Sequence, residues 1–406
     1  MKARPKNRRD AGRLLGPIFH EFCCRLWWLT AGLSPENDVL LFMARGGLRL
    51  HFLFELFLEL NHLPMPISRE RFWISRFAAV KLSFAEASDL AADNLAREFA
   101  AGTCRDLAAA LLPEQLYPEK AGLTETLPTD LISAPVTREN VLRLFAAPCP
   151  FSETLRTHFR EQHDIGHTAF DARFGKFAAL HAVDTGWFGS ALGSLQAGFP
   201  GRHWDAFFFG RWNYRGNVPP HFGDVYGLMI DAEGRKVRSG TEVFLEYHHL
   251  IESVLEPELP SVEYYLPDGS CNAMIPGWEK RIEGAGENEL WEGVKEYFAD
   301  RPAMDLCSCT AATERVLKQW KRLLRYPSPA EARLLEVPPR SADFGKRKTV
   351  PVFAVPEQSG AAARLRGIKR SLWPAGAIAV SCRHGIRLRQ MLWRWGRRLL
   401  NDRGAV

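Results

Sequence analysis

Short apolar runs alternate along this chain with longer segments in which apolar residues recur every three or four positions. Residues 38–44 begin with Asp38 and continue as an unbroken apolar run, which is typical of a buried strand, and residues 48–60 carry leucine and phenylalanine at helical spacing. Gly46 and Gly47 separate the two segments. The same order of strand, glycine turn and helix recurs over residues 177–196. We therefore predict two strand–turn–helix units.

The remaining apolar segments extend this alternation. Strands are predicted at residues 71–75, 204–209 and 226–230, and helices at residues 14–31, 86–101, 137–146, 152–162, 241–255, 287–298 and 311–324. Such alternation predicts an α/β fold, with a mostly parallel sheet and helices on both of its faces. Residues 85–160 are mainly helical in pattern, so we expect a helical insertion there.

Positive charge is concentrated at the two ends of the chain. The formal net charge is +6, but residues 1–13 hold six Lys/Arg and one Asp, and residues 361–406 hold eleven Lys/Arg and one Asp. The rest of the chain therefore carries −9. An acidic body argues against a nucleic-acid-binding face.

Three segments follow from these patterns: a basic N-terminal tail (1–13), an α/β domain (14–350) and a basic tail containing Pro, Arg and Trp (351–406). The sequence contains no run of eighteen apolar residues, so a membrane span is not expected. His20, Glu21 and Arg25 interrupt the first apolar segment, unlike a secretory signal. The eight cysteines are scattered, as expected of reduced thiols in a cytoplasmic protein.

The first glycine turn is a candidate ligand site. Two glycines allow a sharp turn that exposes N–H groups at a helix start, where the helix dipole favours an anion such as phosphate. Arg45, directly before Gly46 and Gly47, would add a bidentate contact with phosphate or carboxylate. The alternative is a tight turn whose arginine is solvated.

The second glycine turn repeats this chemistry with an acidic residue. Asp184, Thr185 and Gly186 follow a predicted strand, and Gly189 and Ser190 precede a predicted helix. Backbone amides there would hold an anion while Asp184 binds a hydroxyl or a metal, for which Mg²⁺ is the candidate. In an open sheet both turns would lie at the carboxyl edge of the strands and would share one cleft.

Histidines form two further groups, within residues 163–167 and 246–252. Their spacings of three or four residues suit metal ligands, but Gly166 weakens a helical interpretation of the first group. Neither group has the zinc-protease pattern of a glutamate between two histidines on one helix face. Packed or surface histidines, without a metal, are therefore the expectation.

The C-terminal segment, residues 384–400, has the pattern of a basic amphipathic helix. Ile386, Met391, Leu392 and Trp395 fall near one side, and arginines supply the charge. Such a helix lies on an anionic membrane surface or packs on the protein itself. Both alternatives remain open from the pattern alone.

Four motifs in order carry a family resemblance: LGPI (15–18), LFMARGG (41–47), ISR (74–76) and VDTGWFGS (183–190). They resemble the region that follows the hydrolase domain in bacterial haloacid-dehalogenase-like (HAD-like) proteins found with surface-polysaccharide and glycosyltransferase genes. The similarity extends through residues 293–298, 326–328 and 343–345. The resemblance adds Arg76 to the candidate ligand-binding residues.

The resemblance implies a cytoplasmic protein of surface-polysaccharide biosynthesis that binds a phosphorylated sugar or nucleotide. It would act as an accessory protein or a transferase, with glycosyltransferases as partners. The HAD nucleophile motif D-x-D-x-[TV] is not recognisable in this chain, and Gly46 replaces the family's usual aspartate. We therefore expect no hydrolysis of phosphate monoesters, and no catalytic residue is assigned.

Two alternatives remain. Residues 43–47 and 183–186 also echo the pyrophosphate and ribose-phosphate loops of type I phosphoribosyltransferases, although one acidic residue stands where that family has two. The other alternative is a non-catalytic module that holds glycosyltransferases at the inner membrane face through its basic tail.

Overall fold

The computed structural model describes residues 5–100, 102–213, 219–232, 240–284, 286, 288–300, 305–341, 349–355, 360–382 and 385–403. Residues 343–345, one of the stretches of family resemblance, lie outside this part of the chain.

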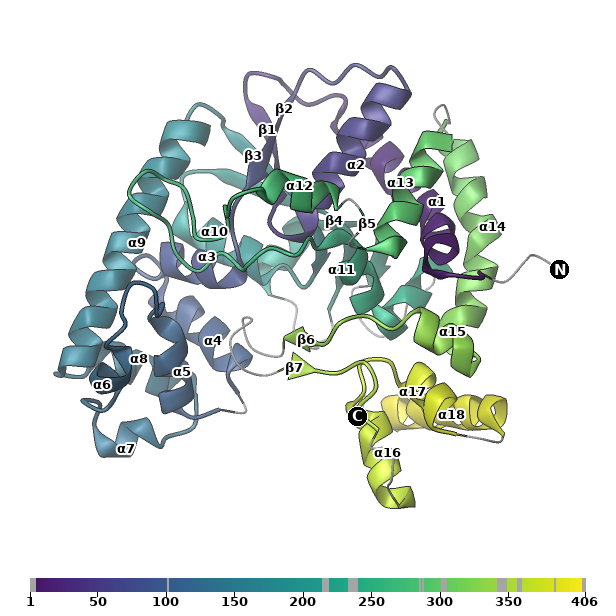
Figure 1. The fold of residues 1–406 in the computed structure, drawn as a ribbon. Coiled ribbons are helices and arrows are strands. Elements are labelled where there is room, and N and C mark those ends of the chain that lie inside the picture. The colour runs from purple at the N-terminus through teal and green to yellow at the C-terminus, as the bar shows by residue number, and fades with distance from the viewer. Residues whose placement is uncertain are drawn as a thin grey trace.

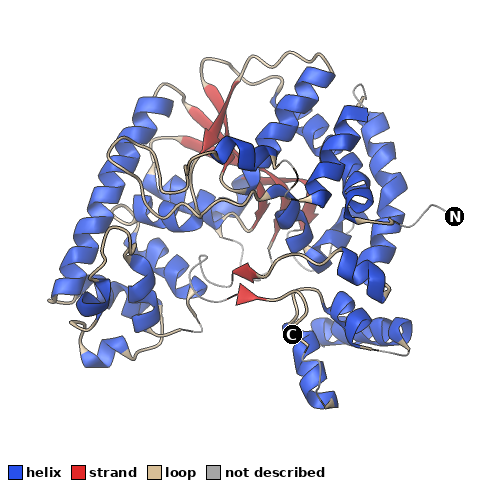
Figure 2. Cartoon of the chain, viewed as in Figure 1, coloured by secondary structure: helices blue, strands red, loops and turns tan. Residues whose placement is uncertain are grey.

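A five-stranded parallel sheet forms the centre of the molecule (Figures 1 and 2). Its strands are β1 (Asp38–Met43), β2 (Ser68–Phe72), β3 (Ala179–Trp187), β4 (His203–Trp212) and β5 (Val225–Ala232), in the spatial order β2-β1-β3-β4-β5. Every neighbouring pair is parallel. The prediction of an α/β fold is confirmed.

Helices cover both faces of the sheet, because strand residues alternate between two apolar cores. Leu40 and Phe42 of β1 belong to one core, and Val39 and Leu41 belong to the other. The first core contains α1 (Arg8–Thr30), α2 (Gly46–Leu60), α11 (His249–Leu255), α13 (Glu289–Asp300) and α14 (Leu306–Arg325). The second contains α3 (Arg76–Ser83), α9 (Pro150–Phe174), α10 (Ser190–Gly198) and α12 (Trp278–Glu283).

Between β2 and β3 the described secondary-structure elements are helices joined by loops. Helices α3 and α9 bracket α4 (Ser88–Glu98), α5 (Cys104–Leu111), α6 (Lys120–Thr124), α7 (Thr129–Ile132) and α8 (Arg138–Ala146). The intervening helices enclose a third apolar core, which includes Leu107, Val141 and Phe151. They form the lower left of Figure 1 and cover the region where the helical insertion was expected.

Four local expectations differ from the structure. Strand β2 covers residues 68–72 instead of the predicted 71–75, so residues 73–75 follow the strand. Residues 184–187 belong to β3 instead of a turn, because Asp184, Gly186 and Trp187 stay in register with β4. Helix α9 continues through Gly166 to Phe174, beyond the expected end at residue 162. Residues 241–255 split into a 3₁₀ segment, η2 (Gly240–Tyr247), and α11; a second short 3₁₀ segment, η1 (Pro220–Asp224), precedes β5.

The C-terminal segment folds into helices at the lower right of Figure 1. After α15 (Pro329–Leu334) and the short antiparallel pair β6 (Arg340–Ser341) and β7 (Thr349–Val350) come α16 (Ala361–Arg370), α17 (Pro374–Ser381) and α18 (Ile386–Arg403). Trp373, at the start of α17, is fully buried, stacks on Tyr247 and donates a hydrogen bond to the Leu324 carbonyl. This tryptophan fastens the segment to the main core. Among the described helices, none is long and apolar enough to cross a membrane.

The amino edge of the sheet is held by a buried histidine. His181 lies between two carboxylates from neighbouring strands, with its Nδ1 at 2.7 Å from Asp205 and its Nε2 at 2.9 Å from Asp38. Burial alone would lower the pKa of His181, but its hydrogen bonds with Asp205 and Asp38 and the charges of both carboxylates raise the pKa above its usual value. The three residues form a charged bridge across β1, β3 and β4.

This bridge predicts a pH-dependent stability. A histidine whose pKa is higher in the folded state stabilises fully below its unfolded pKa of about 6.5, and the stabilisation is lost as the pH rises through the folded value. We expect the difference in unfolding free energy between the wild type and His181→Gln to shrink from pH 6 to pH 9. Urea titrations at both pH values measure it. A difference that is constant with pH would contradict the bridge.

Candidate functional site

The candidate site lies where the connections of the sheet change direction. Helix α2, which follows β1, packs on one face, and α10, which follows β3, packs on the other. Strands β1 and β3 are neighbours, so their carboxyl ends flank the switch point at which ligands bind in open α/β sheets. Both glycine turns predicted from the sequence end here.

The start of α2 packs directly against the end of β3. A Cβ on Gly46 would lie 1.9 Å from Thr185 Oγ1, and a Cβ on Gly47 would lie 2.5 Å from the Val183 carbonyl oxygen. The glycines are therefore needed for the close approach of α2 to β3. Arg45 follows β1 and Asp184 lies near the end of β3, so both residues lie at the carboxyl edge of the sheet, as expected. The peptide bonds Ala44–Arg45 and Gly186–Trp187 are cis.

Asp184 occupies the N-terminus of α2. Its carboxyl accepts hydrogen bonds from the N–H groups of Thr185, at 2.7 Å, and of Gly47. The amide of Gly47, which the sequence assigned to a phosphate, is thus bonded within the protein. Burial raises the pKa of Asp184 to about 8, against the two amide hydrogen bonds and with a further contribution from the charge of Glu256. At pH 7 this carboxyl is protonated.

Arg45 belongs to a charged network that the sequence did not predict. Its guanidinium contacts Glu256 at 2.9 Å and donates to the Leu259 carbonyl at 3.2 Å. Glu256 also pairs with Arg340 of β6, at 2.9 Å. The strap of residues 256–265, which contains Glu256 and Leu259, continues along the carboxyl edge and accepts a hydrogen bond from Ser75 at Val262. No local pattern marks Glu256 or Arg340, because their partners are distant in sequence.

Glu252 completes the network. Its oxygens accept from Trp187 Nε1 at 3.0 Å and pair with His249 Nδ1 at 2.8 Å. Burial alone would raise the pKa of Glu252, but the hydrogen bond with His249 and the charge of His248 lower it below its usual value. Burial lowers the pKa of His248 to about 4. The sequence singled out residues 246–252 for their histidines, whereas Glu252 is the residue that reaches the switch point.

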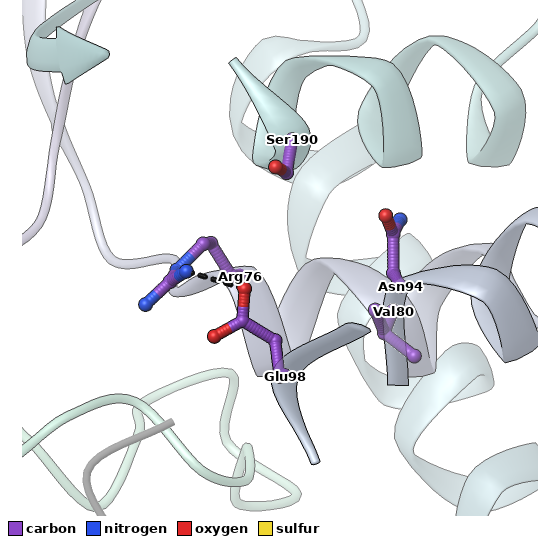
Figure 3. Close-up of a pocket in the computed structure, with 5 residues that line it drawn as sticks. All are labelled: Arg76, Val80, Asn94, Glu98 and Ser190. Carbon is purple, nitrogen blue, oxygen red and sulfur yellow. Dashed lines mark hydrogen bonds and ion pairs between the residues drawn. The ribbon is translucent and has the colours of Figure 1, made fainter. Parts of the chain in front are cut away.

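A second part of the site lies at the N-terminus of α10 (Figure 3). Gly189 precedes this helix with a φ of +76°, a conformation that favours glycine. Ser190 and Arg76 line the same cavity of about 10 Å³, enough for one water, together with Asn94 and Glu98. Arg76 pairs with Glu98 at 2.6 Å and its side chain is half exposed. Two residues from distant motifs are therefore brought together.

The remaining predicted residues, Thr185 and Gly186, lie at the end of β3 and differ in their surroundings. Thr185 is buried, and its Oγ1 has no hydrogen-bond partner in the structure. Gly186 has a φ of +123°, and a Cβ there would lie 2.0 Å from the Gly210 carbonyl oxygen, so its place is structural. Of the two carboxyl groups at this edge, Asp184 accepts amide hydrogen bonds and Glu256 is shared by Arg45 and Arg340.

A larger cavity lies between α18 and the body. It measures about 640 Å³, a size suited to a small molecule, and its lining includes Glu246, Lys369 and Trp393. His248 lines it as well and contacts Trp187 with its ring. This histidine therefore connects the cavity with the switch-point network.

No family model matches this chain, and a search of curated proteins finds no significant match. The site is therefore interpreted from its own chemistry.

The pKa of Asp184 gives a testable prediction. Between pH 4 and pH 8 the folded state holds a proton on Asp184 that the unfolded state has lost, so this residue reduces stability increasingly as the pH rises. Asp184→Asn removes this dependence. Relative to the wild type, we expect the unfolding free energy of the variant to increase by about 3.5 kcal/mol between pH 5 and pH 8.

Urea titrations at the two pH values measure this gain. Glu70→Gln is the matched control, because Glu70 forms an exposed ion pair with Arg173. Its unfolding free energy relative to the wild type should show no comparable change with pH. A pH-independent difference between Asp184→Asn and the wild type would show that Asp184 is ionised in the folded protein.

Proposed function

We propose that this chain binds a phosphorylated sugar or a nucleotide at the carboxyl edge of its sheet. The phosphate binds at the N-terminus of α10, beside Arg76 and Ser190, where displacement of the Glu98 side chain would enlarge a cavity that otherwise has room for one water. The sugar extends toward Asp184 and Glu256. In the cell the chain serves surface-polysaccharide synthesis in the cytoplasm, as an accessory protein or a transferase.

The convergence of Arg76 and Ser190 at a helix start is the observation that supports this proposal most. The first N–H groups of an α-helix have no acceptor within the helix, and the helix dipole favours an anion beside them. Arg76 supplies a guanidinium that matches phosphate oxygens, and a phosphate would replace Glu98 as its partner. At the α2 N-terminus, by contrast, the Asp184 carboxyl already accepts the hydrogen bond of the Gly47 amide.

The neighbouring groups suit sugar hydroxyls. A protonated Asp184 can donate a hydrogen bond, and the Glu256 carboxylate accepts them. The unpartnered Thr185 hydroxyl lies against Gly46 between the two turns. The assignment to polysaccharide synthesis rests on the resemblance carried by residues 41–47, 74–76 and 183–190.

The phosphoribosyltransferase-like alternative gains no support from this arrangement. It needs the carboxylate of Asp184 directed at ribose hydroxyls as an ionised group. In the structure that carboxyl accepts amide hydrogen bonds from Thr185 and Gly47 and is protonated at pH 7.

A binding experiment with uridine diphosphate glucose and with inorganic pyrophosphate tests the proposed site. Because charge-assisted contacts with phosphate contribute about 1.5–3 kcal/mol, we expect Arg76→Gln to weaken binding of both probes at least tenfold. Isothermal titration calorimetry measures the affinities. Arg173→Gln is the matched control, since Arg173 forms a similar exposed pair with Glu70 at 2.6 Å and lies away from the site. Equal affinities for the two variants, or no binding of either probe by the wild type, would refute the site.

The second candidate function, a membrane-peripheral interaction module, is favoured by helix α18. Four large apolar side chains, Leu388, Met391, Leu392 and Trp395, are 51–66% exposed. Their spacing of three or four residues places them on one helix face. Exposed Arg387 and Arg389 flank this face.

The opposite face of α18 holds the helix on the protein. Gln390 is buried and donates to the carbonyls of Pro327 and Ala375, and Arg394 pairs with Glu246 at 2.8 Å. Ile386, which the pattern placed near the apolar side, packs against the body instead. An outward apolar stripe flanked by arginines is the arrangement of helices that lie in the headgroup layer of an anionic membrane.

Vesicle sedimentation tests this second candidate. We expect the wild type to bind vesicles that contain phosphatidylglycerol at low salt, and binding to fall as salt rises. Leu392→Glu combined with Trp395→Glu places two carboxylates in the stripe and should reduce the bound fraction at least tenfold. Leu365→Glu, at an exposed leucine of α16, is the control. Removal of the whole segment is unsuitable, because Trp373 belongs to the main core.

A further inference from the structure

Glu86, His163 and His167 come together on the surface between the helical insertion and the sheet. Each offers one ligand atom, and these atoms lie within 4.8 Å of one another. Glu86 lies in the turn between α3 and α4, and both histidines lie on α9. The sequence indicated the two histidines as possible ligands, but Gly166 weakened the helical interpretation and no pattern marked Glu86.

Gly166 has a different effect in the structure. A Cβ there would lie 2.2 Å from Leu82 Cδ2, so the glycine lets α3 approach α9 closely. The approach carries the turn that contains Glu86 toward the face of α9 that bears His163 and His167. These histidines are four residues apart in one continuous helix, the spacing at which two imidazoles ligate one cation.

We propose that Glu86, His163 and His167 bind a divalent cation of the zinc class. Two imidazole nitrogens and one carboxylate oxygen are a ligand set that zinc accepts, with a fourth position left for water. Glu86 Oε1 lies 2.8 Å from His163 Nε2, and ligand atoms around tetrahedral zinc are roughly 3.3 Å apart. A small outward movement of the exposed Glu86 side chain therefore admits the ion.

Both histidines already have the outer partners that zinc ligands use. His163 Nδ1 lies 3.0 Å from Asp164, and His167 Nε2 lies 3.2 Å from the Leu82 carbonyl. These contacts leave His163 Nε2 and His167 Nδ1 as the ligand atoms. The two rings are stacked at 4.0 Å, so binding requires a rotation of the His163 ring, whose side chain is partly exposed.

The charge around this cluster also favours a cation. The charged groups that act on the two histidines from other residues are the carboxylates of Glu86, Asp164 and Asp171. The second set of possible ligands, His248, His249 and Glu252, differs in this respect. There both carboxylate oxygens of Glu252 are engaged, and Arg340 places a positive charge beside them. The ion would connect the α3–α4 turn to α9.

Titration of the metal-free full-length protein with zinc, followed by calorimetry, tests the proposal. We expect one ion per chain and a higher melting temperature in its presence. Glu86→Gln, at an exposed position, and His167→Gln should each lower the affinity at least tenfold. Asp164→Asn should lower it about tenfold through the orientation of His163.

His249→Gln, in the second set, is the matched control and should bind as the wild type does. Circular dichroism of each variant without zinc separates loss of the ligand from loss of the fold. Failure of the wild type to bind zinc, or binding that is lost in His249→Gln and retained in Glu86→Gln, would overturn the proposal. The experiment does not involve phosphorylated ligands, so its result is independent of the proposed function.

Discussion

The contact between the start of α2 and the end of β3 is the constraint on which the carboxyl edge depends. Parallel strands bring their ends to one edge, but their loops meet only where side chains leave room. Gly46 lies against the Thr185 side chain, and Gly47 lies against the Val183 carbonyl. This contact places the Asp184 carboxyl on the first amides of α2. A carboxyl group of the protein itself therefore accepts the hydrogen bond of the Gly47 amide at that helix start, which is why the proposed phosphate site lies at α10 instead.

The same contact determines the electrostatics of the edge. The charges of Glu252 and Glu256 lie close enough to Asp184 to raise its pKa. Each of these three carboxyl groups is stabilised in a different way. Asp184 keeps its proton, Glu252 is stabilised by His249, and Glu256 is shared between two arginines. The edge therefore presents a donor and acceptors side by side.

The sequence predicted the elements whose signal is local. The apolar run at residues 38–44 and the helical spacing at 48–60 correspond to β1 and α2, and the α/β class follows from their alternation. The nine predicted ligand-binding residues come from the carboxyl end of β3 and from the loops and helix starts that follow β1, β2 and β3.

Predictions from the sequence were wrong where contacts between distant segments determine the local structure. Gly166 looked like a helix breaker, yet its missing side chain is what α3 requires in order to pack on α9. Gly186 looked like a turn, yet it continues β3 because its neighbour in β4 is Gly210. Glu256 and Arg340 carry no pattern at all, since an ion pair between distant segments leaves no periodic trace.

The C-terminal segment shows that attachment and exposure are separate properties of one helix. Trp373 and Tyr247 bury their stacked rings and provide the attachment. Helix α18 then turns Gln390 and Arg394 inward, where hydrogen bonds and an ion pair with Glu246 hold it. Burial of each large apolar side chain is worth about 1.5–3 kcal/mol, so hydrophobic packing alone would favour the opposite rotation. The polar contacts oppose that rotation, and the apolar stripe faces outward as a result.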